Sequence, residues 1–154
     1  MSVAVPPLLS MSRAQLDELY HHSPAGAIPN GAGREVAIVA PGTPLAGFAA
    51  RIMCLLFWQG KVFDARRGEL RNRITVFRLL AVRANVYKGT SRLDGKEAII
   101  LDYSRTSLLA RWVRDEIREV APGVYLGLAY IFNIRIISFA LIFGYGSSAT
   151  RTNA

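Results

Sequence analysis

Cysteine and histidine are almost absent from this chain of 154 residues, and their scarcity excludes several kinds of site. Cys54 is the single cysteine, so an intramolecular disulfide is impossible and a zinc cluster built from cysteines is excluded. The histidines are His21 and His22, and adjacent residues on a helix do not face the same way. We therefore predict no metal site, no cofactor and a reducing compartment.

Acidic residues are also scarce, since 11 Asp and Glu stand against 19 Lys and Arg, which gives a net charge of +8. Such a field favours anionic partners: nucleic acid, an anionic membrane surface or acidic metabolites. The first residues, MSVAVPPLLSMSRAQ, lack the basic leader and hydrophobic core of a signal peptide. The expected location is cytoplasmic, with peripheral membrane contact as a further expectation.

No nucleotide-binding motif is complete in the sequence. The stretch WQGKVFD has a Gly-Lys pair, but it lacks the first glycine and the hydroxyl residue of a phosphate loop. The stretch GAGREV lies before a predicted strand rather than between a strand and a helix, so it is no dinucleotide fingerprint. We predict a turn at Gly60, with Lys61 and Asp64 paired at the rim of the fold. Ser104 lies in YSRTS, outside the Gly-x-Ser-x-Gly context of a hydrolase nucleophile.

The chain is long enough for one domain, which we predict over residues 12–143 between flexible tails at 1–11 and 144–154. The domain begins with a helix near 12–22, where a serine suits the N-cap. A second helix is predicted near 43–59, because its apolar residues recur at helical spacing up to a terminal glycine.

After Gly60 the hydrophobic period changes to the alternation of short antiparallel strands. Apolar and polar residues alternate over 82–87, and an Asp-Gly turn precedes an apolar strand at Ala98–Tyr103. The segment 104–123 fits both a helix and a strand. We favour a short helical piece to about Trp112, followed by a strand that ends at APG.

The most hydrophobic stretch is Val124–Phe143, whose twenty residues match the length of a membrane-spanning helix. Asn133 and Arg135 lie at its centre, where a charge costs about 3 kcal/mol or more in a bilayer. The stretch is rich in Ile, Val, Tyr and Phe, and NIR falls at its midpoint like a hairpin turn. We favour two buried strands, with the membrane helix as the alternative.

These elements predict a mainly β protein with N-terminal helices, folded as an antiparallel up-and-down β-barrel. A closed barrel suits a meander of about eight short strands because it leaves no strand edge unpaired.

Two stretches resemble lipocalin-like proteins of the DUF4334 and GXWXG group. FWQGKVFD, Phe57–Asp64, is similar to the Gly-Lys-aromatic-Asp segment after their first helix. REVAPGVYLGLAYI, Arg118–Ile131, is similar to their later strand-turn-strand segment. The Gly-x-Trp-x-Gly signature is absent, and REVAIVAPG stands in its place. The resemblance implies a calycin-type, lipocalin-like barrel with a cup for a small apolar molecule.

The leading functional hypothesis is therefore non-enzymatic binding of a small hydrophobic or lipid-like molecule. Apolar pockets with a few polar groups are the usual small-molecule sites. The aromatic and basic residues expected to line the cup are Trp58, Lys61, Phe63, Tyr87, Tyr103, Trp112, Arg114, Tyr125 and Tyr130.

The alternative is a barrel enzyme of cyclase, isomerase or hydratase type that acts on a hydrophobic substrate. The run RWVRDEIRE holds the densest ionisable residues, and strand alternation places Asp115 and Glu119 on one side and Arg114 and Glu116 on the other. A carboxyl group in an apolar cup has a raised pKa and can transfer protons. The candidate catalytic residues are Asp102, Tyr103, Asp115, Glu116 and Glu119.

A third hypothesis is a basic accessory subunit of a membrane-associated or nucleic-acid complex. A single barrel covers one face of each strand, so we expect apolar surface outside it for an anionic membrane, a protein partner or a second copy. No RNA-binding signature is present, which disfavours nucleic acid.

Overall fold

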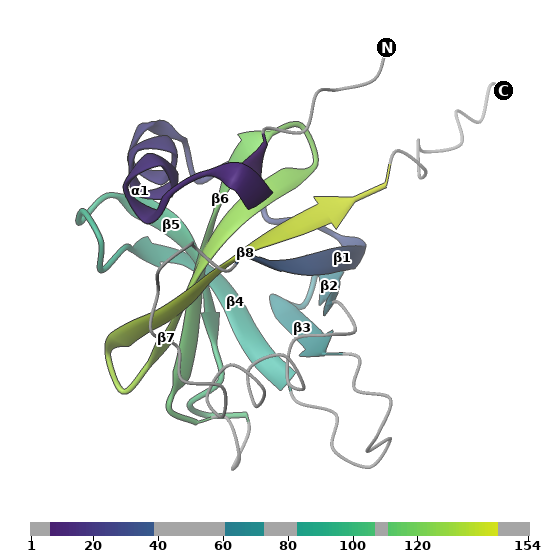
Figure 1. Cartoon of the computed structure of the whole chain (residues 1–154). Coiled ribbons are helices and arrows are strands. Elements are labelled where there is room, and N and C mark those ends of the chain that lie inside the picture. Colours follow the sequence, from purple (N-terminus) through teal and green to yellow (C-terminus); the bar gives the residue numbers. More distant parts are fainter. Residues whose placement is uncertain (1–6, 39–60, 73–82, 107–110, 145–154) are drawn as a thin grey trace, which may run out of the picture.

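The computed structural model describes residues 7–38, 61–72, 83–106 and 111–144 (Figure 1). Within these residues, eight strands form a closed barrel in chain order, and every neighbouring pair is antiparallel. The mainly β, antiparallel barrel predicted from the sequence is confirmed. The elements are a 3-10 turn η1 (Leu8–Ser10), helix α1 (Arg13–His22) and strands β1 (Gly31–Ile38), β2 (Lys61–Asp64), β3 (Glu69–Asn72), β4 (Arg83–Thr90), β5 (Glu97–Asp102), β6 (Val113–Ala121), β7 (Val124–Ile131) and β8 (Ile134–Phe143).

The barrel closes where β1 pairs with β8, from Gly33 opposite Phe143 to Ile38 opposite Ser138. The other edge of β1 pairs with β2, which places Gly33 opposite Lys61. Strand β1 therefore has neighbours on both sides, which is the physical advantage of closing a meander of strands.

The stretch Val124–Phe143 is a β-hairpin, as the alternation and the central NIR predict. Phe132 and Asn133 have positive φ angles of 49° and 67°, the conformation of a two-residue turn between twisted strands. Arg135 lies on β8, where it forms an ion pair with Asp17 of α1 and donates to Ser138 Oγ at 2.8 Å. Among the described residues, no helix has the length and hydrophobicity required to cross a membrane.

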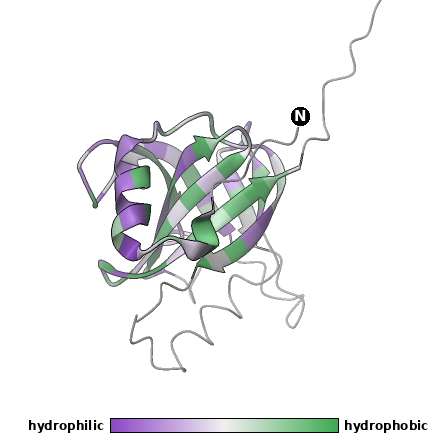
Figure 2. Ribbon diagram, turned by 45° about the horizontal axis from the view of Figure 1, so that its top comes forward, coloured by the Kyte–Doolittle hydropathy of each residue, from purple (hydrophilic) through white to green (hydrophobic). Residues whose placement is uncertain are grey.

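Two apolar clusters lie on opposite sides of the strands β5 to β8. The apolar core inside the barrel includes residues such as Ile99, Leu101 and Phe139. The outer cluster packs Ile100 and Leu126 against helix α1 and the turn η1. Both faces of β5 and β7 are buried, and accordingly β5 is apolar from Ala98 to Leu101 and β7 is apolar along nearly its whole length (Figure 2). Part of the apolar surface expected outside the barrel is thus covered by the chain itself.

Helix α1 begins at the predicted serine. Ser12 accepts from the Gln15 backbone N–H, and the Gln15 side chain accepts from the Ser12 N–H, which completes a capping box. Leu16 and Tyr20 turn inward and are buried. Leu8 of η1, within the segment 1–11 for which we expect a flexible tail, joins them with 3% of its surface exposed and packs onto the barrel.

The strand predicted to end at APG is β6, which is followed by a turn at Pro122 and Gly123. Residues 104–106 and 111–112 are turns, whereas 107–110 lie outside the described residues, as does the helix predicted at 43–59.

Candidate functional site

Four polar side chains meet inside the barrel and form what we call the inner cluster: Glu35, Lys61, Tyr103 and Asp115. Lys61 Nζ donates to Tyr103 Oη at 3.1 Å and lies 3.4 Å from Asp115 Oδ2. It also lies 3.6 Å from Glu35 Oε2, which is an ion-pair distance. Tyr103 Oη in turn donates to Asp115 Oδ2 at 3.4 Å. At most 2% of the Glu35, Lys61 and Asp115 side chains is exposed.

Strand alternation aims these side chains at one another. Lys61 and Phe63 are the buried positions of β2, and Lys61 pairs with Gly33, two residues before Glu35. On the other side of the barrel, Asp115 pairs with Leu101 of β5. Tyr103 follows Leu101 by two residues, so it continues the inward-facing row.

The surroundings of the inner cluster are apolar and change its ionisation. Burial raises the pKa of Glu35 to about 8, although the charge of Lys61 opposes this shift. Burial also raises the pKa of Asp115, again against the attraction of Lys61. For Lys61 itself, burial lowers the pKa, but the nearby charges of Glu35, Tyr103 and Asp115 outweigh burial and raise it. One ammonium thus faces two carboxyl groups, and Glu35 holds a proton at neutral pH.

Three carboxyl oxygens of the inner cluster have no hydrogen-bond donor among the described residues. They are Oε1 and Oε2 of Glu35 and Oδ1 of Asp115, and all three are buried. A buried polar atom without a partner costs about 1 to 3 kcal/mol, so native proteins rarely leave one unmatched. The inner cluster can therefore accept hydrogen bonds from a bound molecule or from water.

The predicted cup residues divide between the inside and the outside of the barrel. Lys61 and Tyr103 belong to the inner cluster, and Phe63 and Tyr125 lie in the apolar core beside them. Tyr125 Oη also donates to the Ala27 carbonyl at 2.7 Å.

The remaining predicted cup residues do not line the interior. Tyr130 belongs to the outer cluster, and Arg114 Nη2 donates to the Thr90 carbonyl at 2.8 Å on the outer surface. Tyr87 and Trp112 are 42% and 46% exposed, and Trp58 lies outside the described residues.

Of the five predicted acid-base residues, the structure brings together Tyr103 and Asp115. Asp102 faces outward and accepts from Tyr87 Oη at 3.1 Å. Glu116 accepts from Ser91 Oγ at 2.7 Å, and Glu119 accepts from the Gly123 N–H at 3.3 Å. The predicted division of β6 is observed, since Arg114, Glu116 and Arg118 share the outer side.

The sequence interpretation missed Glu35 and misplaced the partner of Lys61. Lys61 does not pair with Asp64, because β2 turns the Lys61 side chain inward. Asp64 Oδ1 instead accepts from the backbone of Arg66 and Arg67 in the β2–β3 turn. Glu35 lies on β1 next to Arg34, and the other residues of this strand are small or apolar, so the sequence did not show which of the two charged side chains points inward.

No group of three or more metal-ligating side chains occurs in the part of the chain that the structure describes. His21 Nδ1 lies 3.0 Å from Asp94 Oδ2, and His22 Nε2 lies 3.1 Å from Glu18 Oε2.

A separate apolar cavity of about 240 Å³ lies outside the barrel. It is bounded by η1, by Val36 of β1 and by Ala140 and Ile142 of β8, and it has no charged side chain in its lining. This cavity offers apolar contact without the polar groups of the inner cluster.

Comparison with known proteins agrees with the barrel. No family model matches the chain, and no curated protein matches it. A solved structure described as the crystal structure of a protein from Thermomonospora curvata matches with a TM-score of 0.58 and 20% sequence identity. The match covers 86% of this chain and 88% of that chain. At this identity the likeness shows the fold alone.

Proposed function

We propose that the protein binds a small, mainly apolar molecule inside the barrel, without chemical conversion, and anchors its polar group at the inner cluster. The observation that carries this proposal is the set of three buried carboxyl oxygens that have no donor among the described residues. The partial resemblance to lipocalin-like, calycin-type proteins supports the same conclusion, since such barrels hold ligands in their interior.

The energetics of the inner cluster favour a binding role over a purely structural one. Burying Lys61 with two carboxyl groups has a desolvation cost that well-packed apolar residues would avoid. On the outer side of the described strands, buried charged groups are hydrogen-bonded, as where Arg118 donates to Asp94 at 2.6 and 2.8 Å. Among the described carboxyl groups, buried oxygens without a hydrogen-bond partner occur at Glu35 and Asp115, both inside the barrel.

A second candidate function is acid-base catalysis on a hydrophobic substrate, with Asp115 and Tyr103 in the catalytic roles. The observation that favours it is the Glu35 pKa of about 8, because a group that titrates near neutral pH can give and take a proton. Turnover of the bound molecule distinguishes this candidate from binding alone.

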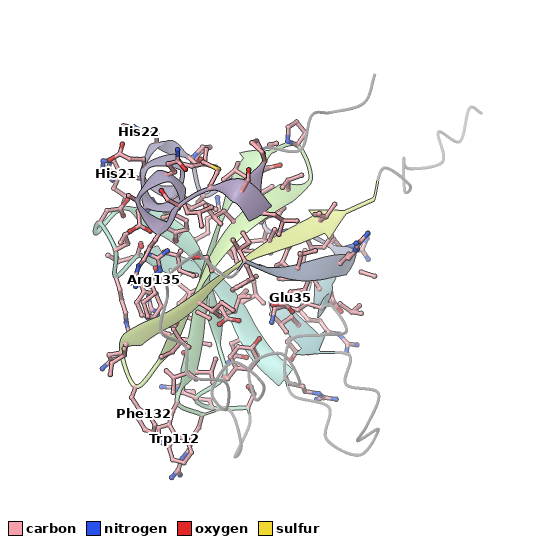
Figure 3. The ribbon with its side chains drawn as sticks, viewed as in Figure 1. His21, His22, Glu35, Trp112, Phe132 and Arg135 are labelled. Carbon is pink, nitrogen blue, oxygen red and sulfur yellow. The ribbon has the colours of Figure 1, made fainter. Side chains whose placement is uncertain are left out.

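We also propose an external partner for the exposed aromatic pair Trp112 and Phe132. Their ring centres lie 5.2 Å apart, and Arg111 lies 4.2 Å from the Trp112 ring. Figure 3 shows the pair at the end of the barrel away from His21 and His22. The partner we favour is a protein surface, including a second copy of this chain, and an anionic membrane is the alternative. The protein would act in a reducing compartment such as the cytoplasm.

Native mass spectrometry followed by solvent extraction tests the binding proposal. Wild-type protein should carry a molecule that Glu35→Gln loses and that Glu18→Gln keeps, because the Glu18 side chain is 74% exposed on α1. Ile142→Phe narrows the outer cavity and should leave binding unchanged. Loss of the molecule in Ile142→Phe but not in Glu35→Gln would move the site to the outer cavity. Wild-type protein that carries no molecule and binds no added apolar probe would overturn the proposal.

A further inference from the structure

We propose that the polar group of the ligand is a cationic hydrogen-bond donor, that is, an amine on an apolar body, held by Glu35 and Asp115. This inference rests on the proposed function and specifies the chemical class of the ligand. The net positive charge of the protein would instead favour a ligand with an anionic head, such as a fatty acid.

The distribution of donors and acceptors in the inner cluster points to a donor. Lys61 and Tyr103 are the donors in the inner cluster, and both direct hydrogen bonds within it, Lys61 to Tyr103 and Tyr103 to Asp115 Oδ2. The atoms without a donor among the described residues are all acceptors when the carboxyl groups are ionised. A bound group that donates several hydrogen bonds is their natural complement, and an ammonium has three such hydrogens.

The charge in the inner cluster points to a cation. Lys61 supplies one positive charge against the carboxyl groups of Glu35 and Asp115, within 3.6 and 3.4 Å. An anionic head would add a negative charge beside Asp115 and would hold Glu35 in its protonated form, in a site shielded from water where charges act strongly on one another. A cationic head would let both carboxylates ionise and would leave the site neutral overall.

A buried ion pair elsewhere in the chain shows what a completed arrangement looks like. Arg118 forms a bidentate pair with Asp94 and also donates to the carbonyls of Tyr20 and Glu97, both at 2.9 Å. Glu116 receives hydrogen bonds from Ser91 and from the Arg92 backbone. Glu35 has the 3.6 Å ion pair with Lys61 but accepts no hydrogen bond, so among the described residues its carboxyl group is short of a donor by comparison.

Amine binding should also displace a proton. Glu35 faces Lys61 of β2, Tyr103 after β5 and Asp115 of β6, and its raised pKa keeps it protonated at neutral pH. A bound ammonium favours the carboxylate, so the Glu35 proton leaves as the ligand enters. Affinity for an amine should therefore increase from pH 6 to pH 8, the range below the Glu35 pKa of about 8.

The test uses three probes that share one alkyl chain: decylamine, decanol and decanoate, titrated into the full-length protein by calorimetry. We expect decylamine to bind about 10-fold more tightly than decanol, with decanoate weakest. Titration in two buffers of different ionisation enthalpy should show release of about one proton per bound amine. Glu35→Gln should bind decylamine and decanol equally, whereas Glu18→Gln should keep the preference.

The outcomes separate this inference from the proposed function. Decanol or decanoate binding at least as tightly as decylamine, or amine binding without proton release, overturns the amine inference and leaves interior binding standing. If none of the three probes binds and the purified protein carries no molecule, both proposals fail. Because proton release is measured on wild-type protein, the inference stays testable even if Glu35→Gln does not fold.

Discussion

Lys61 Nζ lies 3.4 Å from Asp115 Oδ2 inside the barrel, and neither side chain has any exposed surface. The two residues lie far apart in the sequence, since one is on β2 and the other on β6. Their contact makes the charge state of the barrel interior depend on strands that do not pair with each other.

Removing the ammonium should be strongly destabilising. Lys61→Met leaves Glu35 and Asp115 buried without a cation, and breaking a buried ion pair costs about 3 to 5 kcal/mol. Urea unfolding should show this loss. The matched control is Lys88→Met, whose pair with Glu97 is largely exposed and should change stability by less than about 1 kcal/mol. A Lys61→Met protein as stable as wild type would contradict a charged interior.

Stability should fall as pH rises through the titration of Glu35. The ordinary Glu35 pKa is 4.5, and burial raises it to about 8, so between these values the folded state binds more protons than the unfolded state. The stabilisation from this proton is fully present below pH 4.5 and is lost as pH rises through about 8. Urea midpoints between pH 5 and pH 9 should fall less steeply for Glu35→Gln than for wild type. Equal slopes would show that Glu35 is ionised throughout.

Arg118→Lys should destabilise the contact between α1 and the barrel. The Arg118 guanidinium holds Asp94 with two hydrogen bonds and caps the Tyr20 carbonyl, geometry that a lysine ammonium cannot reproduce. We expect a loss of about 2 to 4 kcal/mol, with faster amide hydrogen exchange in α1. Arg92→Lys is the control, because Arg92 is exposed. Unchanged exchange in α1 would count against this role.

Gly127→Ala should disturb the barrel interior through Phe139. A Cβ atom at Gly127 would lie 2.2 Å from the Phe139 ring, which is itself 5.5 Å from Lys61 Nζ. Overpacking of this kind costs about 1 to 3 kcal/mol. A smaller side chain at the facing position, Phe139→Leu, should recover part of the loss in the double variant. Additive effects of the two changes would contradict a direct clash.

The aromatic pair should govern association with partners. Phe132 is 62% exposed, and its φ of 49° is better suited to asparagine, so Trp112→Ser with Phe132→Asn should fold normally. Sedimentation of wild type should depend on concentration and that of the double variant should not. Flotation with anionic vesicles, lost in high salt, would favour the membrane alternative. Wild-type protein that stays monomeric and does not bind vesicles would contradict both self-association and membrane binding.

Several residues of the inner cluster could be found from the sequence and others could not. Asp115 and Tyr103 were named because Asp115 lies in the densest ionisable run and Tyr103 ends the predicted strand Ala98–Tyr103. Lys61 was predicted to bind a ligand, but the inward direction of its side chain was not predicted. Strand β2 has four residues, which is too short a pattern to assign its two faces. Glu35 was missed because the pairing of β1 with β8 decides which face of β1 points into the barrel. This pairing joins strands from opposite ends of the barrel sequence.

The sequence by itself determined the strands, the hairpin at Phe132 and Asn133, the capped helix at Ser12 and the barrel class. These features depend on alternation, turn residues and capping, which act between residues close together in the chain. Only the tertiary structure decided that Glu35, Lys61, Tyr103 and Asp115 meet and that α1 covers the outer cluster. Those relationships join residues far apart in the sequence, so they follow from barrel closure and strand register rather than from any local pattern.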